Sequence, residues 1–325
     1  MSVFERCLEK CRARKGAVVY SDGEDRRVVS AAAKLIREGL VEPILIGDPE
    51  KVRAALQESG ETGVSLQVVN PYNPALLQHN AAEYMSIQKD KGKDISEEEA
   101  IKAVKNPLAA GALMVRRGEA EIGVAGNLSS TADVIRAGLR MVGTAAGSKT
   151  VSSFFFMLKD NNVCMFTDCA VIPEPTSAQL ADIAISTAGV YKRVMGDEAR
   201  VALLSFSTKG SAKHERVDKV RAALEEIKTR EPNLLQLDAA VEPEVARLKA
   251  PGSPVAGNAN VFVFPSLEAG NIGYKIAQRF GGWTALGPLL QGFAHGWHDL
   301  SRGCSSDDIY KISVVGLGMN RGGQQ

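Results

Sequence analysis

A short stretch of the chain gathers the side chains best suited to chemistry. Residues 299–309 (DLSRGCSSDDI) hold a hydroxyl donor at Ser301, a permanent cation at Arg302 and a carboxylate at Asp308. A hydroxyl and a guanidinium fork together suit an oxyanion, and a carboxylate can accept a proton. The same letters also fit an ordinary helix start, because Ser305 and Asp308 have the spacing of a capping box. The pattern alone leaves both interpretations open.

A second candidate lies where a strand predicted at residues 121–126 runs into a turn and a helix. Ser130 and Thr131 open that helix, which carries Arg136. Ligands of open α/β sheets gather at the carboxyl ends of strands and at helix N-termini, so this turn is suited to a phosphate. Helix capping explains the serine and the threonine equally well.

Composition sets broad limits on the kind of protein. A chain of 325 residues with 45% hydrophobic and 24% charged side chains is an ordinary globular protein, large enough for two domains. Its 39 basic and 38 acidic residues leave a net charge of +1, which gives no general attraction to nucleic acid or an anionic membrane. The five cysteines are odd in number and scattered, which fits a reducing cytoplasm. Residues 1–16 resemble neither a secretory signal nor a membrane anchor.

Hydrophobic periodicity predicts alternating strands and helices, as in a parallel α/β fold. Strands are expected at residues 17–21, 44–47, 65–69, 121–126, 201–206, 234–239 and 260–264. Helices are expected at 25–40, 49–57, 74–87, from 96 onward, and at 177–195, 214–229, 243–248, 270–280 and 309–317. Two consecutive apolar strands, 152–158 and 163–171, indicate an antiparallel pair at the start of a second domain.

The expected domains follow from this layout. Residues 1–147 with 296–325 form the first α/β domain, closed by its C-terminal helix, and residues 148–295 form the second. The segment 284–291 is expected to carry the chain back to the first domain. The loop at 209–213 (KGSAK) resembles a phosphate loop but lacks the full GxxxxGK[ST] spacing, so a P-loop nucleotide enzyme is rejected.

Several motifs resemble the phosphate acetyltransferases (phosphotransacetylases), within the family of phosphate acetyl and butyryl transferases. Residues 299–309 and 262–279 (FVFPSLEAGNIGYKIAQR) resemble the C-terminal signature of that family, and the likeness continues through 204–211 (LSFSTKGS) and 249–257 (KAPGSPVAG). It covers nearly the whole chain in the family's order. The resemblance implies two open α/β domains with mostly parallel sheets and a cleft between them, similar to isocitrate and isopropylmalate dehydrogenases.

The resemblance also implies a reaction, the reversible conversion of acetyl phosphate and coenzyme A to acetyl-CoA and phosphate by direct thiol attack in a ternary complex. A thiol with a pKa of about 8.5 is mostly protonated at neutral pH, so a nearby base assists its attack. The family's catalytic serine, arginine and aspartate fall on Ser301, Arg302 and Asp308. Their implied roles are transition-state hydrogen bonding, phosphate binding and thiol deprotonation. No metal and no tightly bound cofactor are implied, since coenzyme A is a substrate.

Further residues match the family's substrate-binding positions. Arg27, Arg136 and Arg279 match family arginines and are expected to contact phosphates of coenzyme A or the substrate phosphate, with Ser130 and Thr131 in the same substrate-binding set. Each arginine is also explained by a surface salt bridge, the ordinary fate of this residue.

The chain departs from the family pattern at two places. Gln88 stands where the family has the arginine of an RKHKG segment, so either the affinity for coenzyme A is altered or Lys89 or Lys91 supplies that cation. The family's Leu-Pro-Glu near the first strand is replaced by the residues YSD at 20–22, which the sequence alone does not explain.

Other functions remain open alongside an acetyltransferase. The chain could transfer butyryl or another acyl group, or act as a non-catalytic module for coenzyme A sensing or oligomerisation. A two-domain dehydrogenase of the isocitrate type is a third alternative, although the metal-binding aspartates expected there are not evident. The resemblance implies a cytoplasmic homodimer whose partners are coenzyme A, acetyl phosphate and phosphate.

Overall fold

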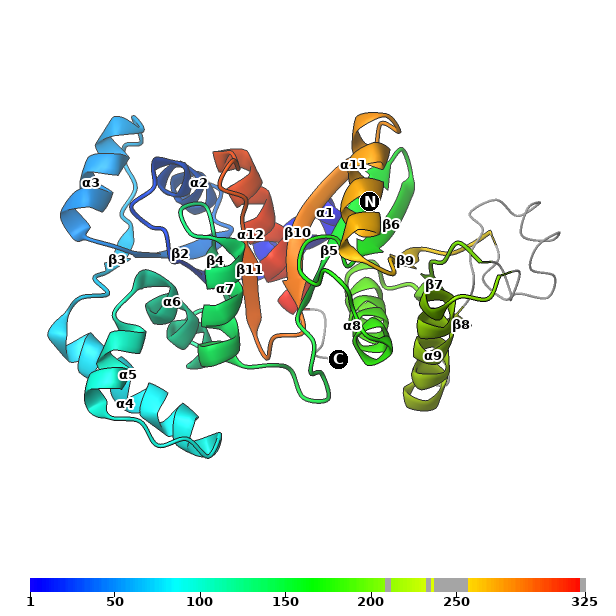
Figure 1. Cartoon of the computed structure of the whole chain (residues 1–325). Coiled ribbons are helices and arrows are strands. Elements are labelled where there is room, and N and C mark those ends of the chain that lie inside the picture. Colours follow the sequence, from blue (N-terminus) through cyan, green and yellow to red (C-terminus); the bar gives the residue numbers. More distant parts are fainter. Residues whose placement is uncertain (208–211, 232–234, 237–256, 322–325) are drawn as a thin grey trace. The chain divides into compact units, whose positions relative to one another are not determined.

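A computed structural model describes residues 1–207, 212–231, 235–236 and 257–321 of the chain (Figure 1). The chain forms two compact units. We call Cys7–Gly143 with Phe293–Gln325 the site unit, and Met1–Arg6 with Thr144–Gly292 the second unit. The helix predicted at 243–248 lies outside the described residues, as do residues 209–211 of the loop considered at 209–213. The division of the sequence into two domains, made above, remains a prediction.

The site unit is built on a sheet of five strands, all of them parallel. Their order is β11 (Gly296–Asp299), β4 (Ile122–Ala125), β1 (Gly16–Tyr20), β2 (Val41–Ile46) and β3 (Gln67–Val69). Parallel pairing places the carboxyl ends of all these strands at one edge of the sheet. Residues 21–25, 126–130 and 300–305 leave the sheet at that edge and lead into helices.

Helices cover both faces of this sheet (Figure 1). One face carries α2 (Arg26–Arg37), α3 (Pro49–Glu58) and α12 (Ser306–Asn320). The other carries α6 (Pro107–Arg116), α7 (Thr131–Ala137) and the π-helix η1 (Gly138–Val142), with the pair α4 (Pro74–Asp90) and α5 (Glu97–Val104) packed beyond α6. The helix α1 (Val3–Ala13) buries Cys7 against Gly318 of α12.

Two fully buried side chains, one in β11 and one in β1, bond to neighbouring helices. Trp297 in β11 donates its indole N–H to the carbonyl of Val134 in α7 at 2.9 Å. The hydroxyl of Tyr20, the last residue of β1, lies 2.7 Å from that of Ser313 in α12. These buried polar contacts hold α7 and α12 against the sheet, so the turns before both helices have fixed starting points.

The second unit has a mixed sheet of six strands. Their order is β10 (Thr284–Gln291), β5 (Ser152–Lys159), β6 (Asn162–Thr167), β9 (Val261–Val263), β7 (Arg200–Leu203) and β8 (Leu235–Gln236). The first three strands are antiparallel and the rest are parallel, so the predicted antiparallel pair is confirmed. Helices α8 (Ser177–Met195) and α9 (Glu215–Arg230) pack together on one face, and α11 (Leu267–Arg279) lies on the other.

Several elements were not expected from the sequence, among them the π-helix η1. The segment predicted as a simple return is strand β10, and both β11 and α6 are additional. Helix α6 (PLAAGALMVR) is buried among α5, η1 and the sheet, and its side chains are apolar nearly all round. It therefore lacks the 3.6-residue periodicity that marks an amphipathic helix. Strand β11 (GWHD) is short and ends in two polar residues, both buried.

Within the described part of the chain, no helix has both the length and the apolar run needed to cross a bilayer.

Candidate active site

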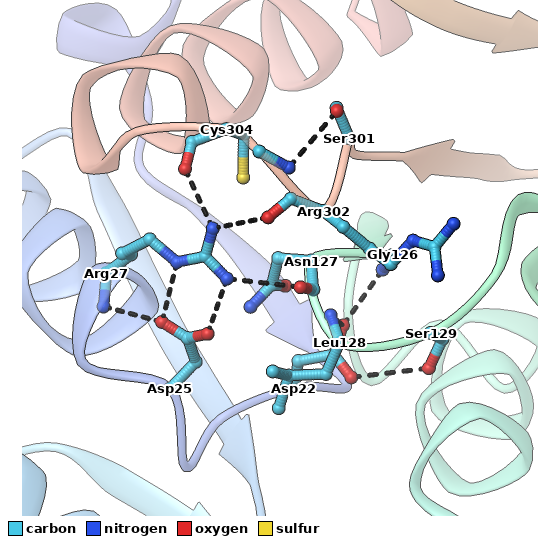
Figure 2. A network of polar contacts seen from close by, with 11 residues as sticks. Asp22, Asp25, Arg27, Gly126, Asn127, Leu128, Ser129, Ser301, Arg302 and Cys304 are labelled. Carbon is cyan, nitrogen blue, oxygen red and sulfur yellow. Dashed lines mark hydrogen bonds and ion pairs between the residues drawn. The ribbon is translucent and has the colours of Figure 1, made fainter.

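Three turns of the site unit meet at the carboxyl edge of its sheet (Figure 2). They are residues 21–25 between β1 and α2, residues 126–130 between β4 and α7, and residues 300–305 between β11 and α12. We call them the β1, β4 and β11 turns. Strands β1 and β11 both pair with β4, so the three turns are neighbours in space although they are far apart in the sequence.

The β11 turn presents Ser301 and Arg302 to solvent. The hydroxyl oxygen of Ser301 accepts the backbone N–H of Gly303 at 3.2 Å, and its carbonyl accepts that of Cys304 at 2.9 Å. Both the Ser301 and the Arg302 side chains are exposed. Among the described residues, no hydrogen bond or ion pair engages the Arg302 guanidinium. The turn therefore displays a hydroxyl and an uncommitted cation next to each other.

Asp308 completes a capping box at the start of α12. Its backbone N–H donates to the Ser305 hydroxyl oxygen at 3.1 Å. Its Oδ2 accepts the Ser305 backbone N–H at 2.9 Å and the Ser305 hydroxyl at 2.8 Å. The carboxylate is nevertheless exposed, and its Oδ1 makes no hydrogen bond within the described residues. The contacts of Asp308 are thus those of a helix-capping residue, and its Oδ1 atom remains open to solvent.

Arg27, the second residue of α2, links all three turns. Its Nε and Nη2 donate to the two carboxylate oxygens of Asp25 at 3.0 and 2.7 Å. Its Nη1 donates to the carbonyls of Arg302 and Cys304 at 2.8 and 2.9 Å. A second bond from Nη2 reaches the carbonyl of Asn127 in the β4 turn at 3.1 Å. A guanidinium has five N–H donors, and all five are used within the protein.

The electrostatics of the Asp25 and Arg27 pair favour the charged forms. Burial raises the pKa of the Asp25 carboxyl, but hydrogen bonds from the Arg27 side chain and backbone outweigh this effect and lower it. The same carboxylate raises the pKa of Arg27. Asp25 is also the N-cap of α2, where it accepts the Arg27 backbone N–H at 2.8 Å. A negative charge at a helix N-terminus is stabilised by the helix dipole.

Asp22 binds the backbone of the β4 turn through its side-chain carboxylate. Its Oδ2 accepts the backbone N–H groups of Gly126 at 2.9 Å and Leu128 at 3.3 Å, and its Oδ1 lies 3.5 Å from the Ser129 hydroxyl. Burial raises the pKa of this carboxyl, and the backbone donors act against the rise. The departure from the family pattern at 20–22 therefore has a structural role, since Tyr20 anchors α12 and Asp22 shapes the β4 turn.

Asp299, the last residue of β11, is a second buried carboxyl at this edge. Its Oδ2 accepts the Thr131 hydroxyl at 2.6 Å, and its Oδ1 is buried with no hydrogen-bond partner in the described part of the chain. Burial raises the pKa of Asp299 to about 6, with a further contribution from Asp22 and an opposing one from Thr131. Its Oδ1 lies against Gly126, where an added Cβ would come within 2.2 Å. Only glycine fits there, at a φ of +108°.

The structure gives Ser130 and Thr131 partners inside the protein. The Ser130 hydroxyl caps α7, donating to the Asp133 carboxylate at 2.7 Å and accepting the Asp133 backbone N–H at 3.2 Å. Since the Thr131 hydroxyl donates to Asp299, neither hydroxyl proton is left for a phosphate in this arrangement. Arg136 pairs with Asp133 one turn away on α7, with about half of its side chain exposed (53%).

A cavity of about 340 Å³ opens beside α7, η1 and the start of α6. Two arginines, Arg136 and Arg140, supply its positive charge, and Asp22 and Ser129 connect it to the β4 turn. Asp133 and Asn106 also line it, and the remaining walls are apolar, formed by Ala103, Pro107, Leu108, Ala109, Ala137 and Met141. Apolar walls with a few polar and charged groups are typical of a small-molecule site, and the two guanidinium groups could bind phosphates.

The remaining sequence-predicted residues are distributed as follows. Gln88 is buried in α4, whereas the Nζ of Lys91 lies 3.5 Å from the Leu139 carbonyl of η1, next to Arg140 of the cavity. Of the two lysines considered as substitutes, Lys91 is thus shown to reach this region. Arg279 is exposed near the end of α11, in the second unit. Within the described residues, no cluster of three or more His, Cys, Asp or Glu side chains is arranged to hold a metal ion.

Sequence reasoning missed three acidic residues of this edge. Asp22 and Asp299 lie at the carboxyl ends of strands, and Asp25 is a helix N-cap. The signal for Asp25 was available, because an acidic residue directly before an amphipathic helix is a common cap. The signal for Asp299 was not, because strand β11 itself was not recognised.

Comparison with solved structures places the whole chain in one fold class. A phosphotransacetylase from Streptococcus pyogenes superimposes with a TM-score of 0.92 at 40% identity, over 98% of this chain and 99% of that chain. The class is therefore the two-sheet α/β fold of the phosphotransacetylases, and the predicted α/β fold with mostly parallel strands is confirmed.

Comparison of sequences then identifies the family. Residues 2–316 match the model of the phosphate acetyl/butaryl transferase family, so the chain belongs to that family. It is 42% identical to the phosphate acetyltransferase of Clostridium acetobutylicum, over 97% of both chains. It is 39% identical to that of Bacillus subtilis, over 96% of this chain and 97% of the relative. The predicted family is confirmed, and the chain is an enzyme of this family.

Proposed function

We propose that this enzyme interconverts acetyl phosphate plus coenzyme A and acetyl-CoA plus phosphate. The observation that carries the proposal is the exposed β11 turn, which displays Ser301 and Arg302 beside the start of α12 with Asp308, in a chain of this family. Similarity to relatives named phosphate acetyltransferase along nearly their whole length favours acetyl transfer.

The proposed chemistry is a direct transfer in a ternary complex. The sulfur of coenzyme A attacks the acetyl carbonyl carbon, a C–S bond forms, and the C–O bond to phosphate breaks. Asp308 accepts the thiol proton through its open Oδ1, which its place in the capping box leaves free. The Ser301 hydroxyl donates to the developing oxyanion, and the Arg302 guanidinium neutralises the departing phosphate. The proton then leaves with phosphate or solvent, and no covalent enzyme intermediate is required.

The cavity beside α7 is the proposed site for the phosphates of coenzyme A. Arg136 and Arg140 line it, and Lys91 lies next to it, in a region where the family's usual cation is replaced by Gln88. The Asp133 partner of Arg136 is exposed, and an exposed ion pair is weak enough to exchange for a phosphate. A contact of Arg279 with substrate stays a prediction.

The test follows the free thiol of coenzyme A after acetyl phosphate is added to the purified protein, without added metal or nucleotide. Butyryl phosphate is run in parallel. Thiol loss with acetyl phosphate, matched by thioester formation, is expected. Faster thiol loss with butyryl phosphate would instead assign the enzyme to longer acyl groups. No thioester with either substrate at millimolar concentrations would favour a coenzyme A-sensing module.

We also propose that two copies associate through the second unit, in the cytoplasm where coenzyme A is found. Helix α11 exposes Ile272 (56%) and Ile276 (54%), and Phe280 (89%) follows at its C-terminal end. Residues four apart share one face of a helix, so these side chains form an apolar stripe that a second copy would cover. Light scattering at micromolar concentration should show a dimer, and Phe280→Ser with Ile276→Ser should shift it towards monomer. A monomeric wild type would refute the proposal.

A further inference from the structure

We propose that Arg27 is a positioning residue, which fixes the β11 turn against the β4 turn and does not bind substrate. The sequence placed Arg27 among the substrate-binding arginines, and the inference rests on the proposed function for the meaning of the β11 turn. The observation behind it is the network of Figure 2, in which Arg27 occupies the point where the three turns converge.

The partners of Arg27 leave no donor for a ligand. Its five N–H groups bind two carboxylate oxygens of Asp25 and the carbonyls of Arg302, Cys304 and Asn127. A bidentate contact with a phosphate needs two of these donors. Two protein acceptors would then lose their partners, and only about a third of the Arg27 side chain is exposed (32%). Arg302, in contrast, has its whole guanidinium available.

The carbonyls that Arg27 binds explain what it positions. The Arg302 and Cys304 carbonyls flank Gly303, so two bonds from one Nη1 atom fix the backbone on both sides of the glycine. This fixes the path of the turn directly after Ser301. The bond to Asn127 ties the same guanidinium to the turn that precedes Ser130 and Thr131. The planar guanidinium of Arg27 therefore spans the distance between the β11 turn and the β4 turn.

Asp25 makes this arrangement rigid. Both of its oxygens bind Arg27, and one also accepts the Arg27 backbone N–H. The Asp25 side chain is only 10% exposed, and both of its oxygens are bound to Arg27, so it is poorly placed to contact substrate itself. If Arg27 acts by position, weakening Asp25 should reproduce the loss caused by changing Arg27. If Arg27 acts by contact with substrate, it should not.

The kinetic test compares Arg27→Lys and Asp25→Asn with Arg26→Lys as the matched control. Arg26 is the adjacent arginine, which is exposed and, among the described residues, pairs only with Glu58, at 3.5 Å. We expect kcat to fall about 10- to 100-fold in both test variants, the size expected when reacting groups are misplaced, with each KM within about threefold of wild type. The control should stay near wild type. A raised KM for either substrate with unchanged kcat in Arg27→Lys, and a normal Asp25→Asn, would overturn the proposal.

Amide hydrogen exchange tests the positioning without any activity. The turn amides of Gly303 and Cys304 bond to Ser301, and Arg27→Lys should speed their exchange while the interior of α12 keeps its protection. Unchanged exchange in the β11 turn of the folded variant would refute positioning, even for an active enzyme. If the wild type made no thioester, the proposed function would fail, yet this exchange result would still decide the role of Arg27. Asp25→Asn, which keeps the Arg27 side chain, provides the same measurement should Arg27→Lys not fold.

Discussion

Replacing Asp308 with asparagine separates its two possible roles, as a helix cap and as a base. The substitution removes the charge but keeps a side-chain oxygen that can accept the Ser305 backbone N–H, now made at 2.9 Å. Ser305, the cap itself, is unchanged. Losing an N-cap residue costs about 0.5 to 2 kcal/mol, and a partial loss at this exposed N3 position belongs at the lower end. The melting temperature should therefore fall by only about 1 to 3 °C.

A base gives a different result. Removing a general base lowers turnover by roughly 10² to 10⁴, which corresponds to about 3 to 5 kcal/mol of activation free energy. We expect Asp308→Asn to show this loss in kcat for thioester formation, with little change in the KM of either substrate. The loss would exceed the effect of a weakened cap several times over, so the two roles are readily distinguished.

Asp307→Asn is the matched control for this experiment. Asp307 is the neighbouring exposed carboxylate, and its Oδ2 pairs with Lys311 on the next turn at 2.6 Å. It carries the same charge at the same helix N-terminus, so its removal reproduces any general loss of negative potential. Equal losses of activity in the two variants would refute a specific role for Asp308. Retention of most activity by Asp308→Asn would do the same, even if acetyl transfer itself were established.

The carboxyl edge of the sheet yields three further predictions. The pKa of Asp299 is about 6 in the folded protein against an ordinary value of 3.8, so the folded state binds more protons and loses stability as the pH rises towards 6. The free energy of unfolding of Asp299→Asn, taken relative to that of wild type in urea, should therefore rise by about 1 to 3 kcal/mol from pH 4 to pH 8. The same difference between variant and wild type at both pH values would contradict this. Thr131→Val leaves the Asp299 carboxylate without its hydroxyl donor. In the same assay it should lower the free energy of unfolding by about 1 to 3 kcal/mol at pH 8 and by less at pH 4. An equal loss of stability at both pH values would count against this prediction. Gly126→Ala would bring a Cβ within 2.2 Å of Asp299 Oδ1 and 2.7 Å of the Leu300 carbonyl, at a φ of +108°. It should lower stability by more than about 2 kcal/mol, and a wild-type melting temperature would show the strain to be absent.

The parts of the fold with strong local signals were predictable from the sequence. Helix α8 was expected at its observed bounds, because its N-cap Thr176 forms a capping box and its C-cap is Gly196 in the left-handed conformation. The capping box expected at Ser305 is present, and another at Ser96 opens α5. Strand β11 was not predicted, since a four-residue strand buried by neighbouring helices has no alternation to reveal it.

The partners of the site residues were harder to predict than their identities. Motif order pointed to Ser301, Arg302 and Asp308, and the family is confirmed, although the roles of these residues stay predictions. Arg27 was expected to contact a phosphate because it matches an arginine of the family, and a surface salt bridge was the alternative. Three of its acceptors are backbone carbonyls between 100 and 277 residues away, and a carbonyl carries no signature in the sequence. Only the pairing of β1 and β11 with β4 brings them within reach.

The order of the strands has a consequence for the synthesis of this protein on the ribosome. The site unit needs β11 and α12, yet the chain makes the whole of Thr144–Gly292 before it reaches them. At about 5 to 20 residues per second, the sheet β4-β1-β2-β3 waits roughly 7 to 30 seconds for its edge strand. During that interval the edge of β4 is unpaired, and neither Ser301 nor Arg302 has been made. A nascent chain can therefore form most of this sheet while it still lacks the β11 turn, and the unpaired edge of β4 is open to pairing with another chain in that interval.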